Sequence, residues 1–216
     1  MTGLNKIKVR SLPPGGAYLD LGTDFEYCNI SNMCIKQAGH SEYQVPENIE
    51  PVVYEAIAAA HELAEHLYHS DWTYNCYLTL KHEYVNPGST GTRPGWHIDG
   101  FMSDQLNFIW FDCLPTQVAV GEFELTLDHN ISLHEMELAA KDKSVYPLLS
   151  KTMYELSQEV VHAPVANETD KPILRTFLKL TFTKDEFNCS RNAWNYKLSH
   201  VRGSKQSGAS RNHGVL

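Results

Sequence analysis

The chain has 216 residues, 42% of them hydrophobic and 20% charged, which suits a single folded domain with a sizeable core. This composition excludes wholesale disorder, and no apolar run approaches the roughly 20 residues needed to span a bilayer. The net charge of −8 argues against a nucleic-acid clamp, because phosphate binding needs a positive surface. The five cysteines form no CxxC pair, and the N-terminus lacks the apolar segment of a secretory signal, so we expect a cytoplasmic protein.

Short strands and loops are expected over residues 1–45, ahead of one clear helix. Apolar side chains recur at helical spacing over residues 47–69, and acidic residues occupy the first turn, where the helix dipole favours them. The pattern then changes to alternation rich in aromatic residues, which predicts β-strands. These strands are expected at residues 72–85, 106–111, 118–127, 159–165 and 173–182.

Two connections interrupt the predicted strands. Residues 86–95 are rich in Gly, Ser, Thr and Pro, which predicts a loop. The long connection over residues 128–158 is expected to include a helix within 134–157. One helix followed by many short strands favours a mainly β protein, with the helix packed outside a β-sandwich or barrel.

The two ends of the chain differ in charge. We expect one domain over residues 1–198, and a flexible polar tail over residues 199–216, which are rich in Gly, Ser and basic side chains. No acidic residue follows Glu186, whereas five basic residues do. A solvated tail is the simpler interpretation, and a contact for an acidic substrate or partner is the alternative.

The first candidate for chemistry is the H-x-D motif of His97 and Asp99. Residues two apart in an extended segment point to the same face, so an imidazole and a carboxylate are presented together. A lone motif of this kind is loosely specific, and a surface His beside a turn Asp is the structural alternative. His162 lies in a later apolar strand, and Arg175 lies in another one thirteen residues further on. Two His and one Asp match the facial triad of non-haem iron(II) sites, and a buried Arg needs an anion.

The order H-x-D, then a distant His, then an Arg about a dozen residues later resembles the iron(II)- and 2-oxoglutarate-dependent dioxygenases, with a distant similarity to their prolyl-hydroxylase-like branch. The resemblance covers residues 72–183. It implies a double-stranded β-helix (jelly-roll) core with a supporting α-helix. It also implies that His97, Asp99 and His162 are the catalytic iron ligands, and that Arg175 pairs with the distal carboxylate of 2-oxoglutarate.

Two further residues are candidates for cosubstrate binding. Tyr84 lies on the strand before the H-x-D loop, where a Tyr helps to hold the cosubstrate in the prolyl-hydroxylase-like branch. Asn107 lies on the strand after the motif, and ordinary strand packing is the alternative for both residues. The family often has Ser or Thr two residues after the Arg, whereas this chain has Phe177 there.

The resemblance implies an oxidoreductase that consumes 2-oxoglutarate and O2, releases succinate and CO2, and hydroxylates its substrate. We expect a small-molecule or peptidyl substrate and no nucleic-acid or membrane partner, and no oligomeric state is predicted. One alternative is a cupin-type metalloenzyme that does not use 2-oxoglutarate and does not need Arg175. The other is a noncatalytic jelly-roll binding module that holds no iron.

Overall fold

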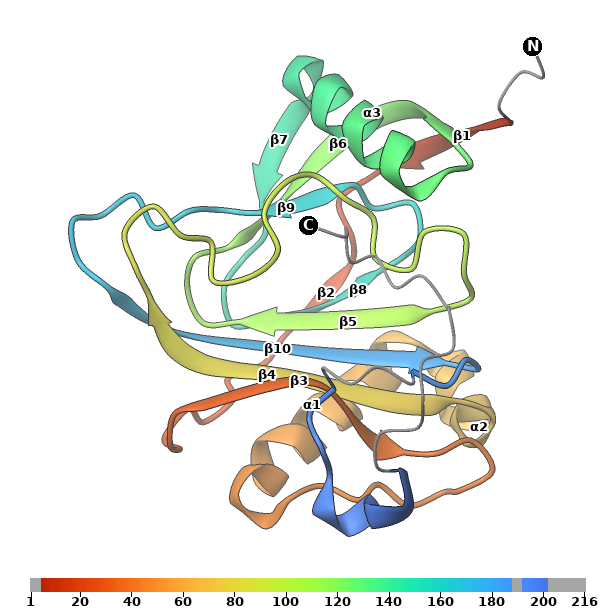
Figure 1. Ribbon diagram of the computed structural model, residues 1–216, viewed down its shortest axis with the longest axis vertical. Helices are drawn as coiled ribbons and strands as arrows, with labels where there is room; N and C mark the ends of the chain where they lie inside the picture. Colours follow the sequence, from red (N-terminus) through yellow and green to blue (C-terminus); the bar gives the residue numbers. More distant parts are fainter. Residues whose placement is uncertain (1–4, 188–191, 202–216) are drawn as a thin grey trace.

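The computed structural model describes residues 5–187 and 192–201, and Figure 1 shows their arrangement. Strands make up most of the regular structure. They are β1 (Lys6–Ser11), β2 (Gly16–Tyr18), β3 (Cys28–Lys36), β4 (Asn75–Val85), β5 (Leu106–Phe111), β6 (Thr116–Thr126), β7 (Ser144–Pro147), β8 (Thr152–Leu156), β9 (His162–Pro164) and β10 (Ile173–Thr183). The α-helices are α1 (Glu50–Leu63), α2 (Glu65–Ser70) and α3 (His129–Ala139). Short 3-10 turns lie at Glu47–Ile49, Asp71–Thr73, Ala140–Asp142 and Tyr196–Val201.

The strands form two antiparallel sheets. The large sheet has the order β2-β8-β5-β10-β4-β3. In the small sheet β6 pairs with β1, β7 and β9, and an isolated bridge between His97 and His162 adds the segment after β4 to its edge. Figure 1 shows the small sheet above one face of the large sheet, with α1 and α2 below the other face.

The order of the strands defines the fold as a double-stranded β-helix. Along the chain, β4, β5, β8 and β10 enter the large sheet, whereas the His97 segment, β6, β7 and β9 enter the small one. Each sheet therefore has four core strands in the arrangement of a jelly roll, in which two sheets face each other. β2 and β3 extend the two edges of the large sheet. The predicted mainly β jelly-roll core with a supporting helix is confirmed.

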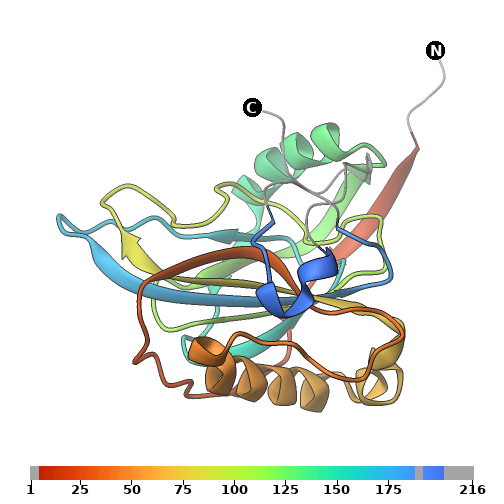
Figure 2. The same ribbon diagram turned by 60° about the horizontal axis from the view of Figure 1, so that its bottom comes forward.

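Alternation along the large sheet decides which side chains can reach a site. One face packs against α1 and holds the main core, in which Leu80, Leu180 and Trp110 are fully buried. Figure 2 shows α1 lying along this face. Successive side chains of a strand point to opposite faces, so Lys81 and Lys179 face the small sheet instead. The functional face of the large sheet is therefore its inner face.

The predicted helix over 47–69 is present but is not continuous. A 3-10 turn at Glu47–Ile49 leads into α1, which ends at Leu63. Ala64 then has φ −122° and ψ 79°, outside the helical region, and α2 begins at the next residue. The two helices still cover one face of the large sheet, as the sequence predicted.

The expectation of a helix within 134–157 is largely wrong. Helix α3 begins earlier, because the Asp128 carboxylate accepts hydrogen bonds from the N–H groups of Asn130 and Ile131 and caps its N-terminus. It ends at Ala139, and the rest of the connection forms β7 and β8. Pairing of β8 with both β2 and β5 determines the structure of this segment.

None of the helices in the described part of the chain combines the length and apolar character needed to cross a bilayer. Most of the predicted polar tail, residues 202–216, lies outside the described residues.

Candidate metal centre and cavity

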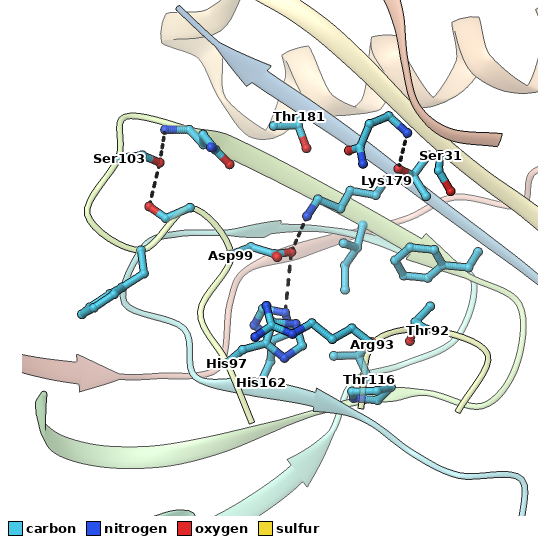
Figure 3. A pocket seen from close by; sticks show the side chains of 18 of the residues that line it. Ser31, Thr92, Arg93, His97, Asp99, Ser103, Thr116, His162, Lys179 and Thr181 are labelled. Atoms are coloured by element: carbon cyan, nitrogen blue, oxygen red, sulfur yellow. Dashed lines mark hydrogen bonds and ion pairs between the residues drawn. The ribbon is translucent and has the colours of Figure 1, made fainter. Parts of the chain in front are cut away.

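The three expected metal ligands meet at one point. His97 and Asp99 follow the loop that leaves β4, and His162 begins β9. Two backbone hydrogen bonds of 2.9 Å join His97 and His162, with an N–H group donating in each direction. Ligand atoms of all three side chains lie within 4.8 Å of one another. Figure 3 shows them converging at the edge of a cavity, with Asp99 between the imidazoles and Lys179.

Both imidazoles present a bare nitrogen to this point. His97 Nδ1 lies 2.8 Å from the carbonyl oxygen of Gly95, and His162 Nδ1 lies 3.0 Å from that of Val160. A carbonyl oxygen can only accept, so each Nδ1 carries the proton and donates it. Each Nε2 therefore keeps its lone pair, and the backbone fixes both rings in the tautomer that binds a metal ion.

The charge state of the triad also suits a metal. Burial, reinforced by the neighbouring His162, lowers the pKa of His97 to about 3, so this imidazole is neutral near pH 7. Burial alone would raise the pKa of Asp99, but the Lys179 ammonium, 2.7 Å from this carboxylate, outweighs burial and holds this pKa well below its usual range. The site therefore offers neutral nitrogen and a carboxylate.

Lys179 belongs to the site, although the sequence analysis did not identify it. Its Nζ donates to Asp99 Oδ2 at 2.7 Å, and His162 Nε2 lies 3.7 Å from the same oxygen. Lys179 follows Arg175 by four positions on β10, so alternation places both on the inner face of the sheet. This spacing is the signal that could have located it. Its ammonium supplies the hydrogen bond that a metal-binding carboxylate usually receives from its surroundings.

A cavity of about 550 Å³ opens beside the triad. Its walls come from the inner faces of β4 and β10, the loop before His97 and the segment after Asp99. A bulge in β3, where Asn32 has a φ of 47°, adds further polar groups to the wall. The lysine and arginine side chains that line the cavity are Lys81, Arg93 and Lys179. The volume falls within the range of small-molecule sites.

Arg175 is buried as expected, with 2% of its surface exposed, but it does not line the cavity. Its Nε donates to the carbonyl oxygen of Cys113 at 3.1 Å, and its Nη1 donates to that of Thr90 at 3.3 Å. The guanidinium carbon lies 5.2 Å from the centre of the Phe177 ring, which does line the cavity. Among the described residues Nη2 has no hydrogen-bond partner. A buried guanidinium nitrogen without a hydrogen-bond partner favours the binding of an anion.

Asn107 and Tyr84, the other expected cosubstrate residues, lie in different surroundings. Asn107 is fully buried, and its Oδ1 accepts a hydrogen bond of 2.8 Å from Thr181, which lines the cavity. Its Nδ2 has no partner in the described part of the chain. Tyr84 is 56% exposed, and its ring packs against Tyr27 at 5.5 Å between centroids. Alternation along β4 turns Tyr84 to the opposite face from the cavity residue Lys81.

The residues present fit a non-haem iron(II) centre. Two imidazoles and one carboxylate form a facial triad that leaves further coordination positions open, and no thiolate belongs to the group. Nη2 of Arg175 and Nδ2 of Asn107 are buried donors without a partner among the described residues, and such donors fit an anionic ligand.

No protein-family model and no curated protein sequence matches this chain. Among solved structures, EvdO2 from Micromonospora carbonacea var. aurantiaca has 14% identity and a TM-score of 0.36, over 62% of this chain and 64% of that one. This chain therefore spans less than two thirds of that structure. AviO1 from Streptomyces viridochromogenes Tue57 has 15% identity and a TM-score of 0.37, over 76% and 75% of the two chains. EvdO2 complexed with 2-oxoglutarate has 13% identity and a TM-score of 0.34, over 69% and 76%. These similarities are too distant to assign a ligand or a function.

Proposed function

We propose that this chain is an iron(II)- and 2-oxoglutarate-dependent dioxygenase that hydroxylates a small-molecule or peptidyl substrate. The observation that carries the proposal is the convergence of His97, Asp99 and His162 at a cavity inside a double-stranded β-helix. Their bare nitrogens and carboxylate are the donor set of a facial-triad iron site, which has open positions for a cosubstrate and O2.

The chain's own residues would hold and isolate the reacting groups. His97, Asp99 and His162 would bind iron(II), and the Lys179 ammonium would fix the orientation of the Asp99 carboxylate. When bound, iron(II), 2-oxoglutarate and O2 would supply the oxidising power: one oxygen atom of O2 would convert 2-oxoglutarate into succinate and CO2, and the other would hydroxylate the substrate. The walls of the cavity would exclude water and keep the target carbon close to the metal.

Arg175 is the proposed partner of the distal carboxylate of 2-oxoglutarate. Its Nη2 is the buried donor without a partner, and a guanidinium matches a carboxylate in shape and charge. The Phe177 ring contacts the guanidinium and lines the cavity, so this ring would have to rotate aside to admit the carboxylate. Asn107 is the other proposed cosubstrate residue, because its Nδ2 is a buried donor without a partner among the described residues.

The experiment is cosubstrate turnover by protein reconstituted with iron(II) under argon and then exposed to O2. We expect slow formation of succinate even without substrate. Arg175→Met should raise the required 2-oxoglutarate concentration about tenfold or more, because a charge-assisted hydrogen bond is lost. Metal affinity should not change. Arg10→Met removes an exposed arginine on β1 and is the matched control.

The position of Phe177 favours a second candidate, a cupin-type metalloenzyme that does not use 2-oxoglutarate. In this candidate Arg175 is a structural residue that bonds the carbonyl groups of Cys113 and Thr90. Iron bound at the triad without any binding of 2-oxoglutarate would support this candidate and contradict the proposed function. Absence of metal binding would instead support the noncatalytic binding module.

A further inference from the structure

We infer that Glu137 and Ser11 are positioning residues of the metal centre, and that each holds one imidazole of the triad through a single peptide group. Glu137 acts on His97, and Ser11 acts on His162. Both roles rest on the metal triad of the proposed function, and neither depends on 2-oxoglutarate.

The peptide group between Gly95 and Trp96 is hydrogen-bonded at both ends. Its carbonyl oxygen accepts the hydrogen bond from Nδ1 of His97, at 2.8 Å. Its N–H group points the other way, as in any trans peptide, and donates to Oε2 of Glu137 at 3.2 Å. The Glu137 carboxylate is therefore connected to the His97 imidazole through one peptide plane.

The peptide group between Val160 and Val161 repeats this arrangement at the second imidazole. Its carbonyl oxygen accepts from Nδ1 of His162 at 3.0 Å, and its N–H group donates to Oγ of Ser11, also at 3.0 Å. Ser11 is the last residue of β1 and is fully buried, so its hydroxyl oxygen takes the place of water for this N–H group. Two ligands from distant parts of the chain are thus held in the same way.

Helix α3 fixes the position of Glu137 beside the H-x-D loop. Figure 1 shows α3 above the small sheet, next to β6. Glu135 accepts two hydrogen bonds from Thr126 at the end of β6, at 2.6 and 2.8 Å. Met136 is buried in the same apolar cluster as Ile98, the residue between His97 and Asp99 in the motif. Successive helical side chains point about 100° apart, so Glu137 lies on the flank of α3 that faces the loop.

Each side-chain acceptor acts on its imidazole in two ways. It fixes the peptide plane, and with it the direction from which the carbonyl oxygen holds the ring. It also polarises the peptide group, and hydrogen bonds in such a chain strengthen one another by about 10–30% each. A stronger bond at Nδ1 keeps the proton on that nitrogen and makes Nε2 a better donor to a metal ion.

Nitrogen-15 NMR of the metal-free protein at pH 7 tests these roles directly. The shifts of Nδ1 and Nε2 distinguish the two tautomers of a neutral imidazole, and His97→Gln and His162→Gln assign the signals. We expect both rings of the wild type to carry the proton on Nδ1. Glu137→Leu should move the two shifts of His97 toward each other, because its tautomer is less strictly fixed, and should leave His162 unchanged. Ser11→Ala should have the converse effect.

Manganese(II) affinity, followed by electron paramagnetic resonance of the free ion, is the second measurement. Direct hydrogen-bond partners of metal ligands contribute about 10–100-fold to affinity, and these residues act one bond further away. We therefore expect a loss of about threefold in Glu137→Leu. The loss should be about tenfold in Ser11→Ala, because a buried N–H group is left without an acceptor.

The other variants separate the hydrogen bonds from general effects on the fold. Glu137→Gln keeps an oxygen acceptor and should retain most of the affinity and of the wild-type shifts. Glu55→Leu changes another exposed helical glutamate, and Ser132→Ala changes another buried serine. Both controls should leave the two rings and the affinity unchanged. Glu137 is exposed, so its variants test the proposal whatever the stability of Ser11→Ala.

Two results would overturn the inference. One is wild-type nitrogen shifts at both rings in Glu137→Leu and Ser11→Ala. The other is an equal change at both rings in each variant, which would indicate a general loss of structure. Failure of the wild type to bind any metal would refute the proposed function, whereas the shifts of the metal-free protein would still decide the two positioning roles.

Discussion

Acid should destabilise the metal-free protein through His97. The pKa of this imidazole falls from its ordinary value of 6.5 to about 3 in the folded chain, chiefly because the ring is buried. The folded state therefore binds fewer protons than the unfolded state between these two values, and stability falls as pH decreases through this window. Linkage sets the loss at about 2 kcal/mol between about pH 6.5 and pH 4.5, which is about 4–8 °C in Tm for a chain of this size.

The assay is urea unfolding at several pH values in the presence of a metal chelator. His97→Gln removes the titrating ring. Its loss of stability between about pH 6.5 and pH 4.5 should therefore be smaller than that of the wild type by about 2 kcal/mol. The same lowered pKa implies that metal binding releases no proton from His97 between about pH 5 and pH 7. An equal loss of stability in His97→Gln and wild type would refute this account of the site.

Three further substitutions have definite expected effects. Asp99→Asn should weaken metal binding at least about a hundredfold, measured by competition with a fluorescent chelator, and unchanged affinity would contradict its role as a ligand. Gly100→Ala should destabilise the protein by about 1–3 kcal/mol in urea unfolding, because φ is 69° and an added Cβ would lie 2.9 Å from a neighbouring side chain. Lys36→Met should lower the free energy of unfolding by about 2–4 kcal/mol, because Nζ of this buried lysine donates to the carbonyl oxygens of Asp71 and Tyr74 at 2.6 and 2.8 Å. If Gly100→Ala or Lys36→Met unfolds at the same urea concentration as the wild type, the expected loss of stability at that position is contradicted.

The strands, and the position of His97 and Asp99 on one face, were predictable because they depend on local alternation. The predicted strand at 106–111 matches β5, and the predicted strand at 173–182 matches β10 to within one residue. Alternation also placed His97 and Asp99 on one face. The approach of His162 depends on pairing between distant segments, which the sequence order suggested only through the resemblance to a family.

The misses have physical causes. The segment that forms β8 is almost entirely buried between β2 and β5, so it shows no alternation and was expected to be helical. The N-terminal cap at Asp128 was a readable signal for the earlier start of α3. Lys179 was missed because a lysine in a strand usually faces solvent, whereas here it pairs with a buried carboxylate.

Arg175 shows how far a single residue can be interpreted from its sequence context. Its burial followed from the apolar strand around it, but its hydrogen bonds to two carbonyl groups did not. Those partners belong to loops that the fold brings to the end of β10. Tyr84 lies an odd number of residues from Lys81 on the same strand, so it faces away from the cavity, and only the structure shows that Lys81 lines that cavity.

The most direct measurement is anomalous diffraction at the iron edge from crystals prepared under argon with iron(II) and 2-oxoglutarate. We expect one iron at bonding distance from Nε2 of His97, Nε2 of His162 and the Asp99 carboxylate. Full iron loading with no anomalous peak at this position, and with Lys179 as the sole partner of Asp99, would contradict the central claim.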